Sequence, residues 1–144
     1  MIQEQVKEKL GKKTTDWKAT SSRRIYFTIA QKDISDVGKI LHKDMNMRLA
    51  TISGVDEQTH FELIYHFSHD ATGELFNVRV LLTDRKNPCI DSLSTLFEAA
   101  DWSEREIHEM LGIDFKGHLN LKHLLLNDAW PQGKYPLRKD YVNE

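Results

Sequence analysis

The most constraining feature of this sequence is an alternating stretch near its middle, over residues 60–67. Every second position of the stretch carries a large apolar side chain: Phe61, Leu63, Tyr65 and Phe67. Successive side chains of a β-strand point to opposite faces, so a period of two predicts a strand with one buried face. Because a lone strand is unstable in water, this one predicts a sheet that is covered by an apolar layer.

The pattern predicts three more strands, over residues 25–29, 48–53 and 76–82. Between the first two, residues 33–45 have helical spacing, with Asp33 as the expected N-cap and Asp36 in the first turn. We expect a crossover of the βαβ type, followed by an antiparallel meander over residues 48–82. The predicted fold class is α+β, with a mixed, mostly antiparallel sheet of about four strands and helices on one face.

Two short helices are predicted beyond the sheet. The first covers residues 91–99, where apolar residues recur at helical spacing. The second begins at Ser103, whose side chain forms a capping box with that of Glu106. Arg105 and Glu109 are spaced to form an ion pair on its surface. This helix is expected to end at a glycine, as many helices do.

We expect an N-terminal segment over residues 1–22, an α+β domain over residues 23–112 and an extended tail over residues 113–144. The N-terminal segment leans basic and is expected to be solvated. The tail contains leucine, aromatic, glycine and proline residues without a regular period. Such long irregular segments are usually functional or disordered, and the apolar content of this one argues against disorder. The tail therefore either docks on a partner or wraps its own sheet.

Composition excludes several classes of protein. The formal net charge of −2 gives no field that would attract a nucleic acid. Cys89 is the single cysteine, so the chain forms no internal disulfide and cannot supply the four thiolates of a usual iron–sulfur cluster. No apolar run reaches the ~18 residues of a membrane span, and no signal pattern opens the sequence. We expect a protein of the cytosol, or one held by other proteins on the cytosolic side of a membrane complex.

Seven histidines raise the alternative of a free-standing, His-dependent metalloenzyme. His60 and His66 share one face of a predicted strand, but six residues of strand separate them by about 20 Å. His108, His118 and His123 lack the spacing of metal ligands, and no HExxH motif occurs. Phosphate-binding loops and nucleophile elbows are also missing. We therefore expect no catalytic, cofactor-binding or metal-binding residue in this chain.

From residue 100 onward the sequence contains a set of residues at fixed offsets: Glu104-Arg105-Glu106, Glu109, Met110-Leu111, His118, Lys122, Leu124-Leu125 and Pro136 to Tyr141. In these residues the sequence resembles a known family, the C subunits of respiratory complex I (NADH:quinone oxidoreductase) and of the related membrane-bound, energy-converting NiFe hydrogenases. The resemblance covers residues 60–141 well and residues 23–60 in general architecture. Three residues depart from the family pattern: His108, Leu119 and Tyr135.

The resemblance implies a non-catalytic subunit in the peripheral arm of a membrane-bound, ion-translocating oxidoreductase, on the cytoplasmic face of the cell membrane. Its partners would be a hydrogenase-like large subunit, an iron–sulfur small subunit and, indirectly, the membrane arm. Iron–sulfur clusters, and a NiFe centre in a hydrogenase, would lie in those partners, with no cofactor in this chain.

The compact chain favours an energy-converting NiFe hydrogenase, in which proton reduction to hydrogen is coupled to ion pumping. The alternative is the C subunit of a complex-I-type NAD(P)H or ferredoxin:quinone oxidoreductase. By the resemblance, the partner interface comprises Glu104, Arg105, Glu106, His118, Lys122, Trp130, Pro136, Leu137, Arg138, Lys139, Asp140 and Tyr141.

Overall fold

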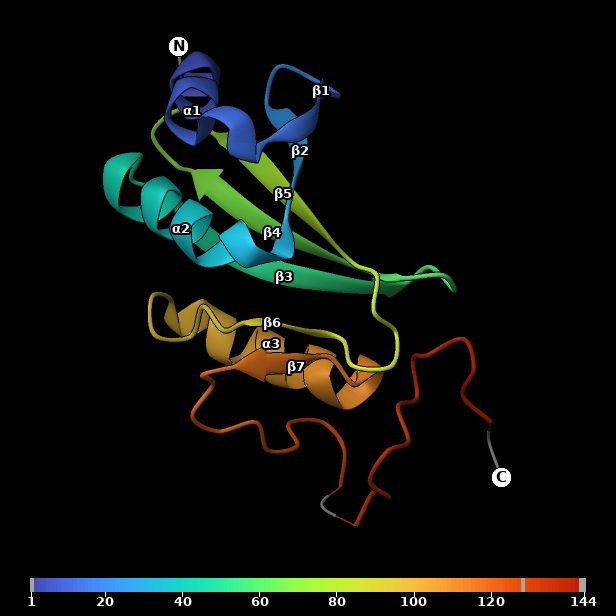
Figure 1. Cartoon of the computed structure of the whole chain (residues 1–144). Coiled ribbons are helices and arrows are strands. Elements are labelled where there is room, and N and C mark those ends of the chain that lie inside the picture. Colours follow the sequence, from blue (N-terminus) through green and yellow to red (C-terminus); the bar gives the residue numbers. More distant parts are fainter. Residues whose placement is uncertain (1, 128, 143–144) are drawn as a thin grey trace.

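The structure is a computed structural model that describes residues 2–127 and 129–142. Its centre is a five-stranded sheet with the strand order β1-β2-β5-β4-β3 (Figure 1). Strand β2 pairs with β5 in parallel, and the other neighbouring strands pair antiparallel, which confirms the predicted mixed sheet. The strands are β1 (Thr15–Ala19), β2 (Arg24–Ile29), β3 (Arg48–Asp56), β4 (Phe61–His69) and β5 (Glu74–Leu82).

A helical segment connects β2 to β3 across the sheet. Helix α2 (Ile34–Lys39) follows a 3-10 turn (Gln31–Asp33) and continues into a π-helical turn (Ile40–Asp44). The predicted crossover is present, with β5 and β4 inserted between its two strands. Asp33 stands at the N-cap position of α2, as predicted, but its backbone is already helical, at φ −94°, and among the described residues its side chain makes no capping hydrogen bond.

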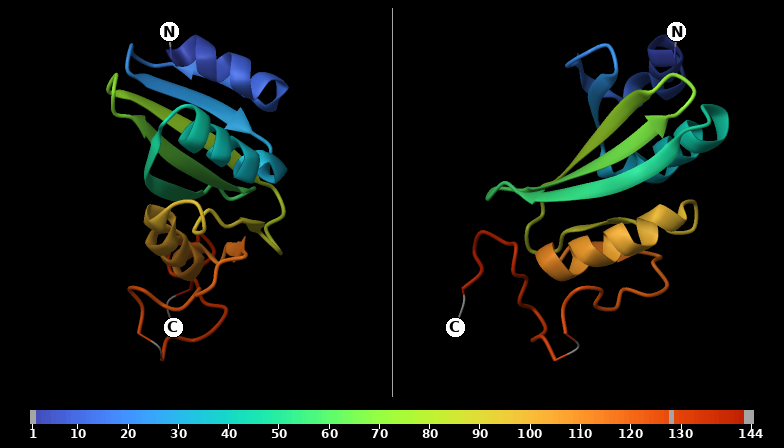
Figure 2. Two further views of the ribbon diagram at one scale, coloured as in Figure 1. Left: turned by 90° about the vertical axis from the view of Figure 1, so that its left-hand side faces the viewer. Right: turned by 180° about the vertical axis from the view of Figure 1, so that it is seen from behind.

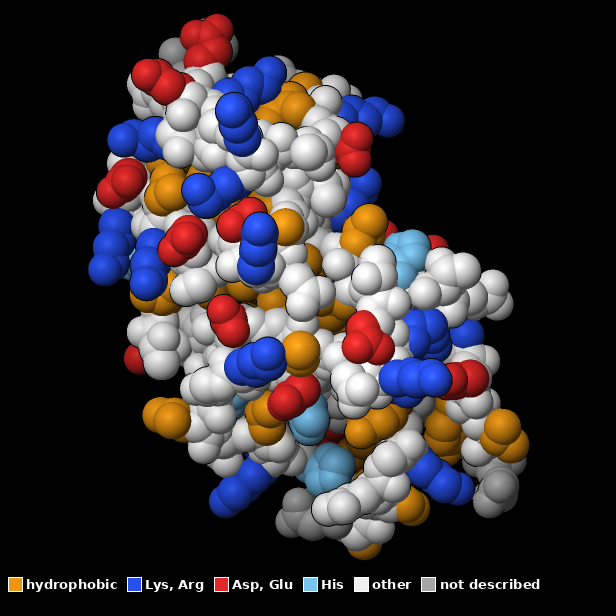
Figure 3. Space-filling model, viewed as in Figure 1, with side chains coloured by type: hydrophobic (Ala, Val, Ile, Leu, Met, Phe, Trp, Pro, Cys, Tyr) orange, Lys and Arg blue, Asp and Glu red, His pale blue; other side chains and the backbone are white. Residues whose placement is uncertain are grey.

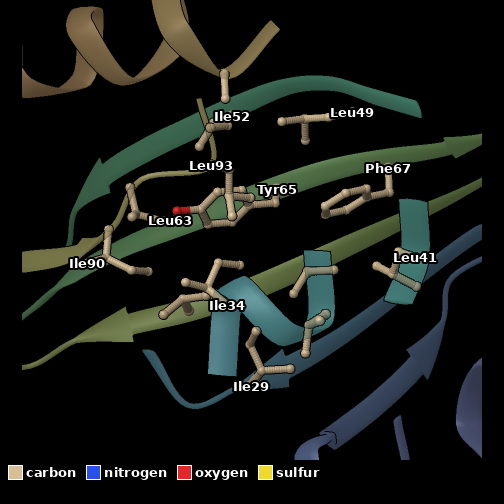
Figure 4. Close-up of a cluster of buried hydrophobic side chains, with 14 of the residues drawn as sticks. Ile29, Ile34, Leu41, Leu49, Ile52, Leu63, Tyr65, Phe67, Ile90 and Leu93 are labelled. Carbon is tan, nitrogen blue, oxygen red and sulfur yellow. The ribbon is translucent and has the colours of Figure 1, made fainter. Parts of the chain in front are cut away.

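The alternating stretch forms β4, and its apolar face is buried as predicted. Helices α1 (Ile2–Leu10) and α2 lie over this side of the sheet (Figure 2). Figure 4 shows Ile34 and Leu41 from the crossover segment on the same side as Tyr65. Burying one such side chain stabilises the fold by about 1.5–3 kcal/mol. The β4 side chains with 0% exposure are Phe61, Leu63, Tyr65 and Phe67.

The N-terminal segment is folded onto the domain, so the expectation that it is solvated is wrong. Strand β1 pairs with β2, and the Trp17 ring stacks on Phe27 with 5.0 Å between ring centroids. Val6 and Leu10 of α1 are buried. Strand β1 shows no alternating burial: Trp17 is its one half-buried residue, and its pairing with β2 shifts register between Thr15 and Lys18.

A second layer lies beside β3. Strands β6 (Cys89–Asp91) and β7 (Asp114–Lys116) pair in parallel, and helix α3 (Glu98–Leu111) lies between them in the chain. Helix α3 packs on β3 at Gly54, where an added Cβ would lie 2.9 Å from Leu111 Cδ1. The glycine therefore permits the close approach of helix to strand.

The prediction of two separate helices over residues 91–111 is wrong, because a single helix begins at Glu98. Ser103 lies inside this helix and so cannot form the predicted N-terminal capping box with Glu106. The helix ends at Gly112, which has the left-handed φ of 77° typical of a helix C-terminus.

The irregular tail follows β7 and lies at the opposite end of the molecule from α1 (Figures 1 and 2). Its described residues, 117–127 and 129–142, form no further helix or strand. In the described ranges, no helix combines the length and the apolar character that crossing a bilayer requires. The candidate functional site lies on this tail and on helix α3 beneath it.

Candidate functional site

Helix α3 carries a buried carboxylate that ties the helix to the turn before it. The Glu104 side chain is 0% exposed and accepts hydrogen bonds from the Ser92 hydroxyl at 2.5 Å and the Leu93 N–H at 2.8 Å. Burial raises the pKa of Glu104, and the two hydrogen bonds counteract this rise. Glu104 therefore holds α3 against the preceding turn.

His118 opens the tail and is held by the same helix. Its side chain is 2% exposed, and its Nε2 lies 2.9 Å from Asp101 Oδ1 and 4.0 Å from Glu104 Oε1. The Asn120 N–H donates to Nδ1 at 3.0 Å. Since Nδ1 accepts a hydrogen bond, the network assigns the ring proton to Nε2, which faces Asp101. The imidazole thus fixes the first tail residues on α3.

Arg105 and Glu109 lie one turn apart on α3 and both contact the next part of the tail. Arg105 donates to the carbonyl of Lys122 at 3.1 Å and to that of His123 at 2.9 Å. Glu109 accepts three successive backbone N–H groups, those of residues 124–126, at 2.9, 2.7 and 3.3 Å. The predicted ion pair between Arg105 and Glu109 is wrong, because each side chain turns to the tail. We call these contacts the first anchor.

The first anchor holds Glu109 in its charged form. The Glu109 side chain is 1% exposed, and His123 Nδ1 lies 3.2 Å from its Oε2. Burial raises the pKa of Glu109, but the backbone N–H bonds from residues 124–126 outweigh burial and leave the pKa below its usual value. Glu109 is therefore a carboxylate at neutral pH, the form that accepts all these hydrogen bonds.

A second anchor holds the far end of the tail at the end of β3. The Asp56 side chain is 1% exposed, lies 2.5 Å from Arg85 Nη1 and accepts the Lys139 N–H at 2.9 Å. The hydrogen bonds from Arg85 hold the pKa of Asp56 well below its usual range, against the effect of burial. Beside this contact, Arg138 Nε donates to the Leu111 carbonyl at 2.5 Å.

A glycine makes room for the second anchor. The Arg138 guanidinium stacks over the rings of Phe61 and Tyr135, at 5.0 and 4.6 Å from their centroids. A Cβ added at Gly112 would lie 2.5 Å from Tyr135 Cε2 and 2.7 Å from Arg138 Nη2. Gly112 therefore ends α3 and also leaves the space that Tyr135 and Arg138 fill.

Beyond the first anchor, the tail makes further contacts with itself and with α3. The Trp130 indole N–H donates to the Lys134 carbonyl at 2.7 Å, and the Trp130 ring stacks on Tyr141 with 6.4 Å between centroids. The Leu137 N–H donates to the Met110 carbonyl at 3.1 Å. These contacts tie Trp130 to the end of the tail and the tail to the end of α3.

Large apolar side chains remain uncovered on α3 and on the tail. Such exposure commonly marks a protein–protein contact, and tryptophan is over-represented among the residues that dominate binding. Figure 3 shows hydrophobic side chains at the surface at its lower right, where the tail lies. We call the following residues the docking surface: Trp102 (66% exposed), Leu119 (92%), Leu125 (63%), Leu137 (63%) and Val142 (67%).

The histidines make separate contacts. The two nitrogens of His66 lie 2.9 Å from Ser53 Oγ and 2.5 Å from Asn77 Oδ1, and His108 Nδ1 lies 2.9 Å from the Ile113 carbonyl. Within residues 2–127 and 129–142, no three His, Cys, Asp or Glu side chains are grouped so that they could hold a metal ion. The metalloenzyme alternative gains no support from the described residues.

Comparison with known families matches residues 27–144 to the 30 kDa subunit of respiratory-chain NADH dehydrogenase. The chain belongs to this family. The C subunit of an NADH-quinone oxidoreductase from Citrifermentans bemidjiense is 36% identical over 118 residues, which are 79% of this chain and 71% of that protein. The family resemblance predicted from residues 60–141 is confirmed.

Two solved structures are similar to this member of the 30 kDa subunit family. One belongs to the membrane-bound sulfane sulfur reductase, an archaeal respiratory membrane complex, with a TM-score of 0.86, 26% identity and coverage of 98% of this chain and 84% of that one. The other is the trypsin-resistant fragment of Nqo5, with a TM-score of 0.71, 24% identity and coverage of 83% and 99%. The second similarity concerns the fold only.

The interface residues that the family resemblance implied occupy different environments. Glu104, Arg105 and His118 contact their own chain, as described above. The role of the whole set at a partner interface stays a prediction. The exposed members are Glu106, Lys122, Leu137, Lys139 and Asp140, and the half-buried members are Trp130, Pro136, Arg138 and Tyr141.

Proposed function

We propose that this chain is a non-catalytic subunit of a membrane-bound, ion-translocating oxidoreductase and that it docks on a hydrogenase-like large subunit through α3 and the tail. One observation carries the proposal. The exposed apolar side chain of Trp102 lies on α3, and those of Leu119 and Leu125 lie on the tail that α3 holds by hydrogen bonds. A surface of this kind is stabilised when a partner covers it.

Trp102 is the first residue to test on this surface. It lies on the outer side of α3 beside a hollow that is also lined by Leu119 and Asp101. A buried tryptophan at the centre of an interface typically contributes about 2 kcal/mol or more to binding. We therefore expect Trp102→Ala to weaken assembly strongly while leaving the fold intact, since the side chain is 66% exposed.

The branch of the family is the finer part of the proposal. We retain the prediction of an energy-converting NiFe hydrogenase, and similarity over 98% of this chain to a chain of an archaeal respiratory membrane complex supports membership of a membrane-bound complex. The 36% identity to the C subunit of an NADH-quinone oxidoreductase supports the alternative, a complex-I-type enzyme. In both branches the iron–sulfur clusters would belong to partner subunits at the cytoplasmic face of the membrane.

The experiment is affinity purification of the tagged chain from its native host in mild detergent, followed by mass spectrometry. Recovery of a large subunit with two CxxC pairs supports the hydrogenase branch, and a large subunit without them supports the complex-I branch. Trp102→Ala should reduce recovery of either one. Recovery of the chain without partners would contradict the proposal, and stoichiometric zinc, nickel or iron in that chain would favour the metalloenzyme.

A further inference from the structure

Both anchors have the same chemical design. In each, a buried carboxylate of the folded domain accepts backbone N–H groups of the tail: Glu109 accepts those of residues 124–126, and Asp56 accepts that of Lys139. Arginines complete each anchor. Arg105 binds tail carbonyls at the first, and Arg85 holds the Asp56 carboxylate at the second.

We propose that Glu109 and Asp56 are positioning residues that order the tail on its own domain before any partner binds. The described residues between the anchors, 127 and 129–138, are then presented to the partner already ordered. The identity of the partner rests on the proposed function, whereas the ordering of the tail is a property of the free chain. The inference replaces the expectation that the tail becomes ordered on a partner.

The first anchor recognises one short backbone stretch, because it binds both carbonyl groups and N–H groups within it. Arg105 takes the carbonyls of residues 122–123, and Glu109 takes the N–H groups of residues 124–126. Three N–H groups that converge on one carboxylate fix the backbone torsions between them, as in an anion-binding nest. The lowered pKa of Glu109 agrees with this geometry, because it shows that the hydrogen bonds stabilise the charged carboxylate by more than burial destabilises it.

Apolar burial holds little of the tail. No apolar residue among its described residues, 117–127 and 129–142, is fully buried, and His118, whose side chain is 2% exposed, is held by polar contacts. Apolar burial therefore cannot order this segment in the way that it orders the sheet. Removing the acceptor of an anchor should release the tail locally and leave the domain folded.

Pre-ordering affects how a partner binds. A segment that must fold on its partner loses conformational entropy at that moment, which weakens binding for a given contact area. A loop pinned at Glu109 and Asp56 has lost most of that entropy already. Loss of an anchor should therefore weaken assembly even though neither carboxylate, at 1% exposure, can contact a partner directly.

The test is hydrogen exchange of the purified full-length chain, read at the amides of residues 124–126 and of Lys139. We expect these amides in the native chain to exchange at least about tenfold more slowly than in an unstructured peptide, as hydrogen bonds to charged acceptors imply. Glu109→Gln should remove the protection at residues 124–126, and Asp56→Asn should remove it at Lys139. The amides of β4 should stay protected in both variants, which shows that the domain is folded.

The matched control is Glu106→Gln, an exposed carboxylate on the same helix, which should leave all these amides protected. Amides 124–126 that exchange at peptide rates in the native chain, or that keep their protection in Glu109→Gln, would overturn the inference. Failure of the proposed function would look different. If the amides are protected but the chain recruits no partner, the ordering of the tail is supported and the docking proposal is refuted. If the amides are unprotected but the chain assembles with a partner, the docking proposal is supported and the ordering of the tail is refuted.

Discussion

The sheet domain and the tail of this chain are ordered by different forces. In the domain, β4 buries four large apolar side chains at 0% exposure against helices that cover the sheet. In the tail, no described apolar residue is fully buried, and order comes from polar contacts, among them hydrogen bonds to Glu109, Asp56 and Arg105. Apolar burial is distributed and cooperative, whereas a polar anchor is local. The two regions should therefore respond differently to single substitutions.

The largest difference in unfolding free energy is expected between alanine substitutions of a large apolar residue in the core and of one in the tail. Phe67→Ala should lower the free energy of unfolding by about 3–5 kcal/mol, because it leaves a cavity in the sheet core. Leu119→Ala should change it by less than about 0.5 kcal/mol, because Leu119 is 92% exposed. Urea unfolding of the two variants measures both values. A large effect at Leu119 would mean that the tail belongs to the cooperative core.

A glycine pair tests the contact between the two regions. Gly112→Ala and Gly133→Ala both place alanine at positive φ, at 77° and 80°, which costs roughly 1–2 kcal/mol. Only at Gly112 would the new Cβ meet Tyr135 and Arg138, and we expect a further cost of about 1–3 kcal/mol there. Thermal denaturation gives the difference. Equal effects at the two positions would show that the second anchor does not pack on Gly112.

Asp56 links the two regions and should make stability depend on pH. The folded pKa of Asp56 is lowered by Arg85, so its contribution is present above the unfolded pKa of about 4 and is lost as the pH falls below that value. Asp56→Asn should lower the free energy of unfolding by about 1–3 kcal/mol at pH 7 and by less at pH 3. Unfolding curves at the two pH values test this, and an effect that is the same at both would contradict the assignment.

Glu104 should show the opposite pH dependence, with the smallest effect of the four. Burial raises its folded pKa, so the stabilisation is present below the unfolded pKa and is lost as the pH rises through the folded pKa. The free energy of unfolding of Glu104→Gln, taken relative to that of the native chain, should therefore be higher at pH 8 than at pH 4. The difference should be a fraction of the ~1 kcal/mol typical of point substitutions. Melting temperatures at both pH values provide the measurement, and the reverse order would refute a raised pKa.

The central strands β2 to β5, which are held by apolar burial, could be predicted from the sequence, whereas the packing of the N-terminal segment could not. The alternation at Phe61 to Phe67 gives β4 directly, and the strands around it follow from the same period. The helical pattern over residues 91–97 was misleading, because the same apolar spacing also fits a turn. There Leu93 is placed by the Glu104 carboxylate, which no local pattern shows.

The anchors could not be predicted from the sequence for a related reason. Asp56 binds Arg85 and Lys139, which are 29 and 83 positions away, and it stands in a stretch that reads only as a turn. Helical spacing predicts a pair between Arg105 and Glu109, although both side chains bind the tail. Polar pairs between distant segments leave no periodic signal in a sequence. The family signature contained Glu109 and Arg105 without showing what they contact.

The most direct test of the docking proposal is lysine cross-linking of the detergent-purified complex, read by mass spectrometry. Lys122 and Lys139 lie on the tail, and Lys9 and Lys12 lie at the opposite end of the molecule (Figure 1). The proposal predicts cross-links from Lys122 and Lys139 to the large subunit. Cross-links to that subunit only from Lys9 and Lys12, with Lys122 and Lys139 reacting as free surface lysines, would contradict it.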